Sequence, residues 1–220
     1  MSSSRDTMLD RIRTALAAGP ALLPPMPDWV APVHPPLPAA DLAEVFAENF
    51  QRIGGEFFYC ESLAQFGATL RGWLAERLFP GQQFYVWEPA LQALLTQVEV
   101  PFQATEADFI AQAAAGMTSC EALVARTGSL VVTPATASGR RLSIYPDQHL
   151  VLARPGQVVA EIGDALRVVQ ARYGPELPSM LSLTTGPSRT ADIEKTLVLG
   201  AHGPRRLSLF LVEDDAEIAA

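Results

Sequence analysis

The fold of this chain is decided by residues 57–87, which read FFYCESLAQFGATLRGWLAERLFPGQQFYVW. The first four residues are apolar or aromatic, and Phe84–Trp87 repeats that composition, which predicts two buried strands. Between them, apolar residues recur every three or four positions, which predicts a helix that ends at Pro80-Gly81. Because a helix separates the two strands, we expect the strands to be parallel and the helix to cover their sheet.

The same alternation continues toward the C-terminus. Further strands are predicted at 129–133, 149–153, 181–184 and 206–212. Further helices are predicted at 91–98, at 105–116, on the apolar positions between 158 and 169, and from Gly186-Pro187 to Gly200. We therefore predict an α/β class, with three α/β/α layers around a mainly parallel sheet. Residues 41–220 are expected to form this single domain.

Residues 1–40 are predicted to form an arm outside the domain. Ser3 and Asp6 have the spacing of a capping box at the start of a short helix. One face of that helix is apolar and carries Met8, Ile12 and Leu16. Eight of the nineteen residues from 20 to 38 are proline, a composition that favours an extended chain over a packed core.

Composition and charge exclude several classes of protein. Acidic residues outnumber basic residues by 24 to 16, and Lys195 is the only lysine. A nucleic-acid surface needs clustered cations, so no nucleic-acid partner is expected. The longest uncharged stretch, 14–27, is shorter than the ~20 apolar residues of a membrane span and contains several prolines. The charges near the N-terminus do not fit a signal peptide, so a cytoplasmic location without a membrane span is expected.

The chain offers few groups that hold a cofactor or a metal. Cys60 and Cys120 are too few for an iron–sulfur cluster, and their apolar surroundings predict buried free thiols. Three histidines without paired spacing predict no metal site. Neither a glycine-rich dinucleotide motif nor a Walker loop occurs, so no cofactor is expected in this chain.

The stretch from Thr184 to Glu194, TTGPSRTADIE, is the strongest candidate for a ligand site. It follows a predicted strand and opens a predicted helix, which places it at the carboxyl edge where open α/β sheets bind ligands. Gly186 permits a tight turn, and the amides of Ser188, Arg189 and Thr190 are placed as donors to an anion at the helix start. Arg189 adds a guanidinium that grips a carboxylate or phosphate at two points. The alternative is an ordinary helix start that is capped by Ser188 or Thr190.

Two histidines are the candidate catalytic residues. His202 lies in the stretch 200–206, which joins a predicted helix to the last predicted strand, and its alternative role is to cap that helix. Connectivity puts this stretch at the opposite edge of the sheet from Gly186, more than ~10 Å away. His149 follows Asp147 by two residues, and a carboxylate partner would tune its imidazole. Either histidine would carry a proton only if folding brings it near the anion.

The C-terminal half of the chain resembles the LUD domain of lactate utilisation proteins. The resemblance runs from about Gly55 to Glu213, and its most specific parts are GPSRTADIE at 186–194 and GAHGPR at 200–205. The short N-terminal helix is similar to the start of the C-type proteins of this family. The related B subunit carries ferredoxin-type cysteine motifs, and this chain has none. The chain is therefore identified as a LUD-domain protein of the lactate utilisation protein C type.

This resemblance implies a fold like that of glucosamine-phosphate isomerases, ribose-phosphate isomerases and CoA transferases. It also implies participation, with two iron–sulfur subunits, in oxidising L-lactate to pyruvate. One position departs from the family, because Arg126-Thr127-Gly128 stands where Glu-Thr-Gly or Glu-Ser-Gly is usual. A CoA transferase of this fold needs a glutamate nucleophile in such a motif, so Arg126 argues against acyl-CoA chemistry. Arg126 and Thr127 either strengthen a carboxylate site or lie on the surface.

Three functions from different classes stay open on these observations. The first is an accessory, non-redox subunit of an L-lactate oxidation system that binds a small carboxylate or docks the iron–sulfur subunits. Electron transfer would then be supplied elsewhere, since no redox cofactor site is recognised in this chain. The second is a stand-alone enzyme that acts on a sugar phosphate or another small anion. The third is a pure protein-interaction module whose N-terminal arm wraps a partner.

Overall fold

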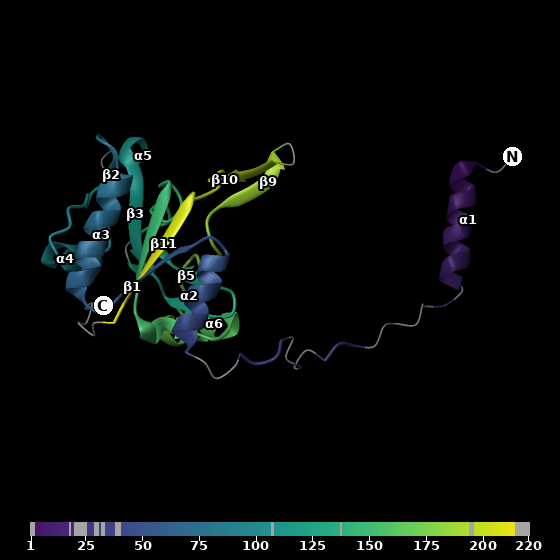
Figure 1. Cartoon of the computed structure of the whole chain (residues 1–220). Coiled ribbons are helices and arrows are strands. Elements are labelled where there is room, and N and C mark those ends of the chain that lie inside the picture. The colour runs from purple at the N-terminus through teal and green to yellow at the C-terminus, as the bar shows by residue number, and fades with distance from the viewer. Residues whose placement is uncertain are drawn as a thin grey trace. The chain divides into compact units, whose positions relative to one another are not determined.

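The computed structural model of the chain (Figure 1) describes residues 3–17, 19, 26–28, 31, 34–37, 41–106, 108–136, 138–193 and 196–213. The chain has two compact units, residues 1–36 and 37–220. Most of the proline-rich stretch and the predicted domain boundary at residue 40 lie outside the described residues. That boundary therefore stays a prediction.

The first unit contains one described helix, α1 (Ser4–Ala17). The capping box is present, because the amide of Asp6 donates to the Ser3 hydroxyl and the amide of Ser3 donates to the Asp6 carboxylate. None of the residues of α1 is buried. The start of the helix is thus stabilised by local hydrogen bonds, not by a packed core.

A five-stranded parallel sheet forms the centre of the second unit. Its strand order is β1–β11–β6–β3–β2, and every neighbouring pair is parallel. The strands are β1 (Glu56–Cys60), β2 (Gln83–Val86), β3 (Ala113–Ser119), β6 (Gln148–Ala153) and β11 (Arg206–Val212). The three central strands are almost fully buried, which is why β6 and β11 read as nearly continuous apolar runs.

Helices α3 (Leu63–Arg77) and α4 (Pro89–Gln97) cover one face of this sheet (Figure 1). Phe66 and Trp73 of α3 pack in one core cluster with strand residues such as Phe210. Residues 57–87 therefore fold as predicted, because the apolar face of α3 is removed from water when it packs on the sheet.

The other face is covered by α2 (Leu42–Arg52) and by a second, mixed sheet of strand order β7–β4–β5–β8. Its strands are β4 (Ala122–Val124), β5 (Ser129–Val132), β7 (Val158–Val159) and β8 (Ser182–Thr184). Strand β7, whose two valines were predicted to lie on a helix, pairs with β4 instead. Phe46 and Phe50 of α2 pack between α2 and the two sheets, and α6 (Ile162–Tyr173) packs on the second sheet through Val169. The α/β class with a mainly parallel sheet is confirmed, and the second sheet adds to one covering layer.

The predicted helix at 105–116 is wrong beyond the single turn of α5 (Phe109–Gln112). The residues that follow form β3, although their alanines favour a helix locally. Small side chains are required there because the chain at Leu142 packs directly on the strand. A Cβ on Gly116 would lie 2.7 Å from Leu142 Cδ1 and 2.8 Å from the Leu142 carbonyl oxygen.

The predicted helix after Gly186 is also wrong. Strands β9 (Arg189–Ile193) and β10 (Thr196–Leu199) form an antiparallel ribbon that extends away from the central sheet (Figure 1). The helix was predicted from the four-residue spacing of Ile193 and Leu197. The β-branched residues of both strands favour extended backbone, and this local preference prevails in the structure.

The C-terminal end of α2 contacts two separate turns at very short range. Gly128 has a φ of +62°, and a Cβ there would lie 2.5 Å from the amide nitrogen of Phe50. Gly186 has a φ of +76°, and a Cβ there would lie 2.8 Å from the carbonyl oxygen of Ile53. Only glycine therefore lets both turns reach the backbone of α2.

The substitution Gly128→Ala is expected to destabilise the protein. The new Cβ would clash with the backbone of α2, and overpacking of this kind costs about 1–3 kcal/mol. The left-handed backbone at this position adds roughly 1–2 kcal/mol of strain. We expect chemical denaturation to show a free energy of unfolding that is lower by about 2–5 kcal/mol.

Gly81→Ala is the matched control for this substitution. Gly81 has a φ of +86°, and no heavy atom lies within 4 Å of the Cβ position. The control therefore carries the backbone strain of roughly 1–2 kcal/mol without the clash. Equal losses for the two variants would show that the contact with α2 does not matter.

Candidate functional site

A hollow of about 540 Å³ lies at the amino ends of β6 and β11, and we call it the β6/β11 hollow. His149 and Leu207, the second residues of these two strands, both line it. The rest of its lining comes from Ile53, 143–144, 182–189 and 202–204. Its volume falls in the range of about 300–1,000 Å³ that is typical of small-molecule sites.

The position of this hollow corrects the expectation of a site at the carboxyl edge of the sheet. Strand β8 belongs to the second sheet and not to the central one. The loop that follows β8 therefore runs to the amino ends of β6 and β11. The sequence pattern located the loop correctly but assigned its strand to the wrong sheet.

The loop at 186–189 and the turn at 200–205 lie side by side, where the sequence predicted a separation of more than ~10 Å. The amide of Ser188 donates to the carbonyl of Pro204 at 2.9 Å, and the amide of Gly200 donates to the carbonyl of Ser188 at 3.0 Å. An antiparallel ribbon returns the chain to its starting point, whereas a helix would have carried it away. The two candidate clusters thus line one hollow.

Arg189 lines the hollow with an exposed side chain. Its Nη2 donates to the carbonyl of Ile53 at the end of α2. Gly54, with a φ of +92°, leaves room for this contact, because a Cβ there would lie 2.4 Å from Nη2. A guanidinium has five N–H donors, so further donors remain for a ligand.

The predicted helix start does not supply the anion donors. No helix begins at Gly186, and the amide of Ser188 is occupied by Pro204. Thr190 pairs with Val198 within the ribbon and is not among the residues that line the hollow. Of the expected anion donors, the Arg189 side chain is the one that the structure leaves at the hollow.

His149 lines the hollow from its buried side and is 1% exposed. Its Nε2 lies 2.9 Å from Oγ1 of Thr118 on β3. Burial lowers the pKa of His149 to about 4, so the imidazole is neutral at pH 7. Asp147, the expected partner of this histidine, lies near Arg205 instead, at 3.6 Å. Sequence reasoning missed Thr118 because a helix was predicted up to Gly116, and the strand that carries Thr118 was not recognised.

His202 also lines the hollow, from its exposed turn. Its amide lies 3.4 Å from the hydroxyl of Ser188. Since β10 precedes this turn, His202 caps no helix. Both candidate catalytic histidines therefore face the same hollow as Arg189.

Comparison with known proteins identifies the family of this chain. Residues 43–212 match the LUD domain family. The chain is 30% identical to lactate utilization protein C of Deinococcus radiodurans over 93% of both chains. It is 32% identical to lactate utilization protein C of Bacillus subtilis over 47% of this chain and 44% of that protein. The chain belongs to the LUD-domain family, in the lactate utilization protein C group.

The fold of this LUD-domain protein is shared with a solved structure. A DUF162 family protein from Deinococcus radiodurans superimposes with a TM-score of 0.57 at 22% identity. The match covers 80% of this chain and 99% of the other. This likeness supports the assigned architecture of the LUD domain.

Arg126 and Thr127 of the LUD domain are not among the residues that line the hollow. The Arg126 Nε lies 2.7 and 2.8 Å from the two carboxylate oxygens of Glu161, the N-cap residue of α6. Thr127 accepts a hydrogen bond from Ser129 at 2.7 Å, and Thr185 lies 2.8 Å from the same serine hydroxyl. Thr185 lines the hollow, so Thr127 is connected to it through hydroxyl groups, whereas Arg126 holds the start of α6.

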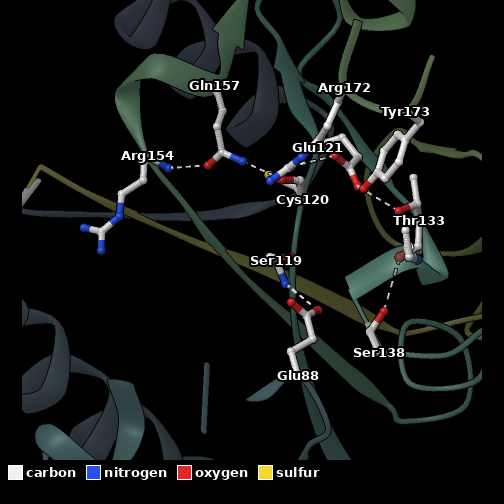
Figure 2. Close-up of polar contacts among 11 residues, drawn as sticks. Glu88, Ser119, Cys120, Glu121, Thr133, Ser138, Arg154, Gln157, Arg172 and Tyr173 are labelled. Atoms are coloured by element: carbon white, nitrogen blue, oxygen red, sulfur yellow. Dashed lines mark hydrogen bonds and ion pairs between the residues drawn. The ribbon is translucent and has the colours of Figure 1, made fainter. Parts of the chain in front are cut away.

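A second polar cluster of the LUD domain lies beyond the carboxyl ends of β2 and β3 (Figure 2). Its centre is Glu121, which is 4% exposed. Glu121 accepts hydrogen bonds from Thr133 at 2.7 Å and Tyr173 at 2.6 Å, and it pairs with Arg172 at 2.9 Å. Both carboxylate oxygens are thus occupied, which indicates a structural link between α6 and the second sheet. Sequence analysis did not single out this residue.

Glu88 is the other buried carboxylate of this cluster (Figure 2). It accepts the amide hydrogen of Ser119 at 2.9 Å, and no cation among the described residues pairs with it. Burial raises the pKa of Glu88 most, and the nearby charge of Glu121 raises it further. The hydrogen bonds from Ser119 and Thr136 lower the pKa but do not cancel the rise. Ionised Glu88 therefore destabilises the fold.

Other candidate chemistries find little support in the described part of the chain. No group of three or more His, Cys, Asp or Glu side chains there is arranged around a metal position. Cys60 and Cys120 are buried and unbridged, as predicted, and burial raises the pKa of both thiols. No described helix combines the length and apolarity that a membrane crossing requires.

The substitution Glu88→Gln is expected to stabilise the LUD domain increasingly as pH rises. In the wild type the folded pKa lies above the unfolded value of 4.5, so the folded state binds the proton more tightly. The stabilisation of the fold by this tighter proton binding is complete below pH 4.5 and is lost as pH rises through the folded pKa of Glu88. Glutamine keeps an acceptor for Ser119 and carries no charge. Denaturant unfolding between pH 4.5 and 8 measures the difference.

Glu121→Gln is the matched control for this substitution. It removes the charge that pairs with Arg172, so it should lower the free energy of unfolding at neutral pH. A Glu88→Gln variant whose stability relative to wild type does not change with pH would show that Glu88 is not the uncompensated group.

Proposed function

We propose that this LUD-domain protein binds a small carboxylate in the β6/β11 hollow and acts as a non-redox component of a lactate-utilisation system. The names of its relatives support the second part, because two of them are lactate utilization proteins C. The first part is supported by the side chains that line the hollow.

The charge of the hollow is the observation that carries this proposal. The whole chain has a formal net charge of −8. Among the described residues, no aspartate or glutamate lines the hollow, whereas Arg189 and His202 do. Ser188 and Thr184 also line the hollow, and their hydroxyls can donate to an anion. An arginine among hydroxyls, with acidic groups excluded, favours a carboxylate over a cation or a neutral ligand.

The proposed non-redox role is supported by the residues that the chain contains. Its two cysteines, Cys60 and Cys120, are both buried, and four thiolates are usual for an iron–sulfur cluster. Oxidation of lactate removes two electrons, which this chain has no recognised group to accept. Under this proposal, the electrons pass to iron–sulfur subunits, and this chain presents or senses the carboxylate.

A sugar phosphate is the second candidate ligand. The volume of about 540 Å³ exceeds the needs of a three-carbon acid, and the hydroxyl-rich lining suits a polyol. A phosphate would use the same arginine. Competition between L-lactate and ribose 5-phosphate, measured by calorimetry, separates the two ligand classes.

The substitution Arg189→Ala is expected to weaken L-lactate binding about 10- to 100-fold. A hydrogen bond to a charged group contributes roughly 1.5–3 kcal/mol, and the variant removes such bonds from the carboxylate. Because Arg189 is exposed, the fold should be retained. Isothermal titration calorimetry with L-lactate measures the change.

Arg205→Ala is the matched control for Arg189→Ala. Arg205 is an exposed arginine on the neighbouring turn, is not among the residues that line the hollow, and lies near Asp147. Arg205→Ala changes the net charge by the same amount as Arg189→Ala. The affinity of the Arg205→Ala variant for L-lactate should nevertheless stay within about threefold of wild type. Equal losses for both variants would indicate general electrostatic attraction, and no loss for Arg189→Ala would reject the site.

The proposed role in lactate oxidation predicts a dependence on this chain. Lactate-dependent reduction of a dye by the iron–sulfur subunits should increase when the chain is added. The Arg189→Ala variant should fail to restore the increase, and Arg205→Ala should restore it. Dye reduction that is the same without the chain would remove it from the oxidation system, and the anion-binding enzyme would become the preferred function.

A further inference from the structure

His149 differs from an ordinary core histidine in the use of its two ring nitrogens. Its Nε2 lies 2.9 Å from the Thr118 hydroxyl. Its Nδ1 has no hydrogen-bond partner among the described residues. Polar side chains that are buried in a protein core are nearly always paired, so an unpaired nitrogen on a residue that is 1% exposed needs an explanation.

The unpaired nitrogen belongs to a residue that lines the β6/β11 hollow. The sealed, unpartnered side-chain atoms of the described core are Trp87 Nε1 and Gln148 Oε1, and Nδ1 of His149 is not one of them. Since His149 lines the hollow, the small accessible part of its ring faces that space. A ligand held by Arg189 in the same hollow would therefore meet Nδ1 as a hydrogen-bonding group.

The pairing with Thr118 lets this nitrogen act either as an acceptor or as a donor. A neutral imidazole carries its proton on one nitrogen, and the hydrogen bond of the other nitrogen selects the tautomer. When the Nε2 proton is donated to the Thr118 oxygen, Nδ1 accepts a hydrogen bond from a hydroxyl. When the Thr118 hydroxyl rotates and donates to Nε2, Nδ1 carries the proton and donates to a carbonyl. Both arrangements keep Nε2 bonded.

We propose that the His149–Thr118 pair recognises the oxygen on the carbon next to the carboxylate, so that the hollow binds 2-hydroxy acids and 2-oxo acids alike. This proposal rests on the carboxylate site at Arg189 proposed above. It names His149 as a specificity-determining residue and Thr118 as its positioning residue. The substrate class is then a 2-hydroxy acid and the 2-oxo acid that its two-electron oxidation yields.

The neutral state of the imidazole is required by this proposal. Burial keeps the pKa of His149 near 4, so tautomer exchange is available throughout the neutral pH range. The groups that approach the ring from β3 and β11 carry no charge, because Thr118 lies on one side and Leu207 is the register neighbour on the other.

The first experiment compares three ligands with the wild-type protein by calorimetry at pH 7. L-Lactate has a 2-hydroxyl, pyruvate has a 2-oxo group and propionate has neither, while all three carry the carboxylate. We expect L-lactate and pyruvate each to bind roughly five- to tenfold more tightly than propionate, which corresponds to one added hydrogen bond. Equal affinities for the three acids would overturn this inference and leave the carboxylate site standing. No binding by any of them would overturn the proposed function itself.

Variants then assign this preference to the two residues. His149→Phe should bring L-lactate and pyruvate down to the affinity of propionate, and the affinity of propionate should not change. Thr118→Val should reduce both preferences, and Thr118→Ser, which keeps the hydroxyl, should restore them. Thr118 is not among the residues that line the hollow, so these two variants alter the partner of His149 and not the lining.

Each outcome of the variant series is decisive. A preference for only one of the two acids in the wild type would reject tautomer exchange, because a fixed tautomer serves one oxidation state. A preference that survives both His149→Phe and Thr118→Val would reject the assignment to this pair. Circular dichroism of each variant checks the fold, and the ligand series on the wild type stands even if His149→Phe does not fold.

Discussion

The rest of the structure depends on the close approach of the last turn of α2 to two loops that are far apart in the sequence. Gly128 and Gly186 each bring backbone to a position where a Cβ would lie less than 3 Å from the backbone of α2. The first contact fixes the second sheet against the helix. The second fixes the loop that carries Arg189. Because these contacts join backbone to backbone, a larger side chain at either glycine has no flexible neighbour to displace.

This arrangement assembles the β6/β11 hollow from separate layers of the fold. The central sheet contributes His149, α2 contributes the carbonyl of Ile53, and the segment after β8 contributes Arg189. The fixed end of α2 holds the guanidinium, while β3 holds the imidazole through Thr118. A cationic group and a neutral polar group thus face one space from elements that pack rigidly. Such preorganisation favours a ligand with a carboxylate and a nearby oxygen.

The two polar clusters of the LUD domain have different physical characters. The carboxylate of Glu121 is surrounded by donors and ties α6 to the second sheet, so its charge is compensated inside the protein. Glu88 has no such cation beside it among the described residues and is destabilising when ionised. The hollow has the opposite sign, with Arg189 at its lining and the compensating anion left to a ligand. The proposed ligand site lies at the amino ends of β6 and β11, although open parallel sheets usually bind at the carboxyl ends.

The sequence by itself determined the α/β class, the strands that form most of the central sheet, and the helix between β1 and β2. These features depend on local apolar periodicity and on turn residues, which a single stretch of chain carries. Tertiary structure alone decided that β3 is a strand, that β9 and β10 form a ribbon, and that His149 and His202 line one hollow with Arg189. For β3 the physical reason is that packing against a distant segment, Leu142 on Gly116, outweighs local helix preferences of a few tenths of a kcal/mol per residue. For the ribbon it is the pairing of β9 with β10, which the spacing of apolar residues did not indicate.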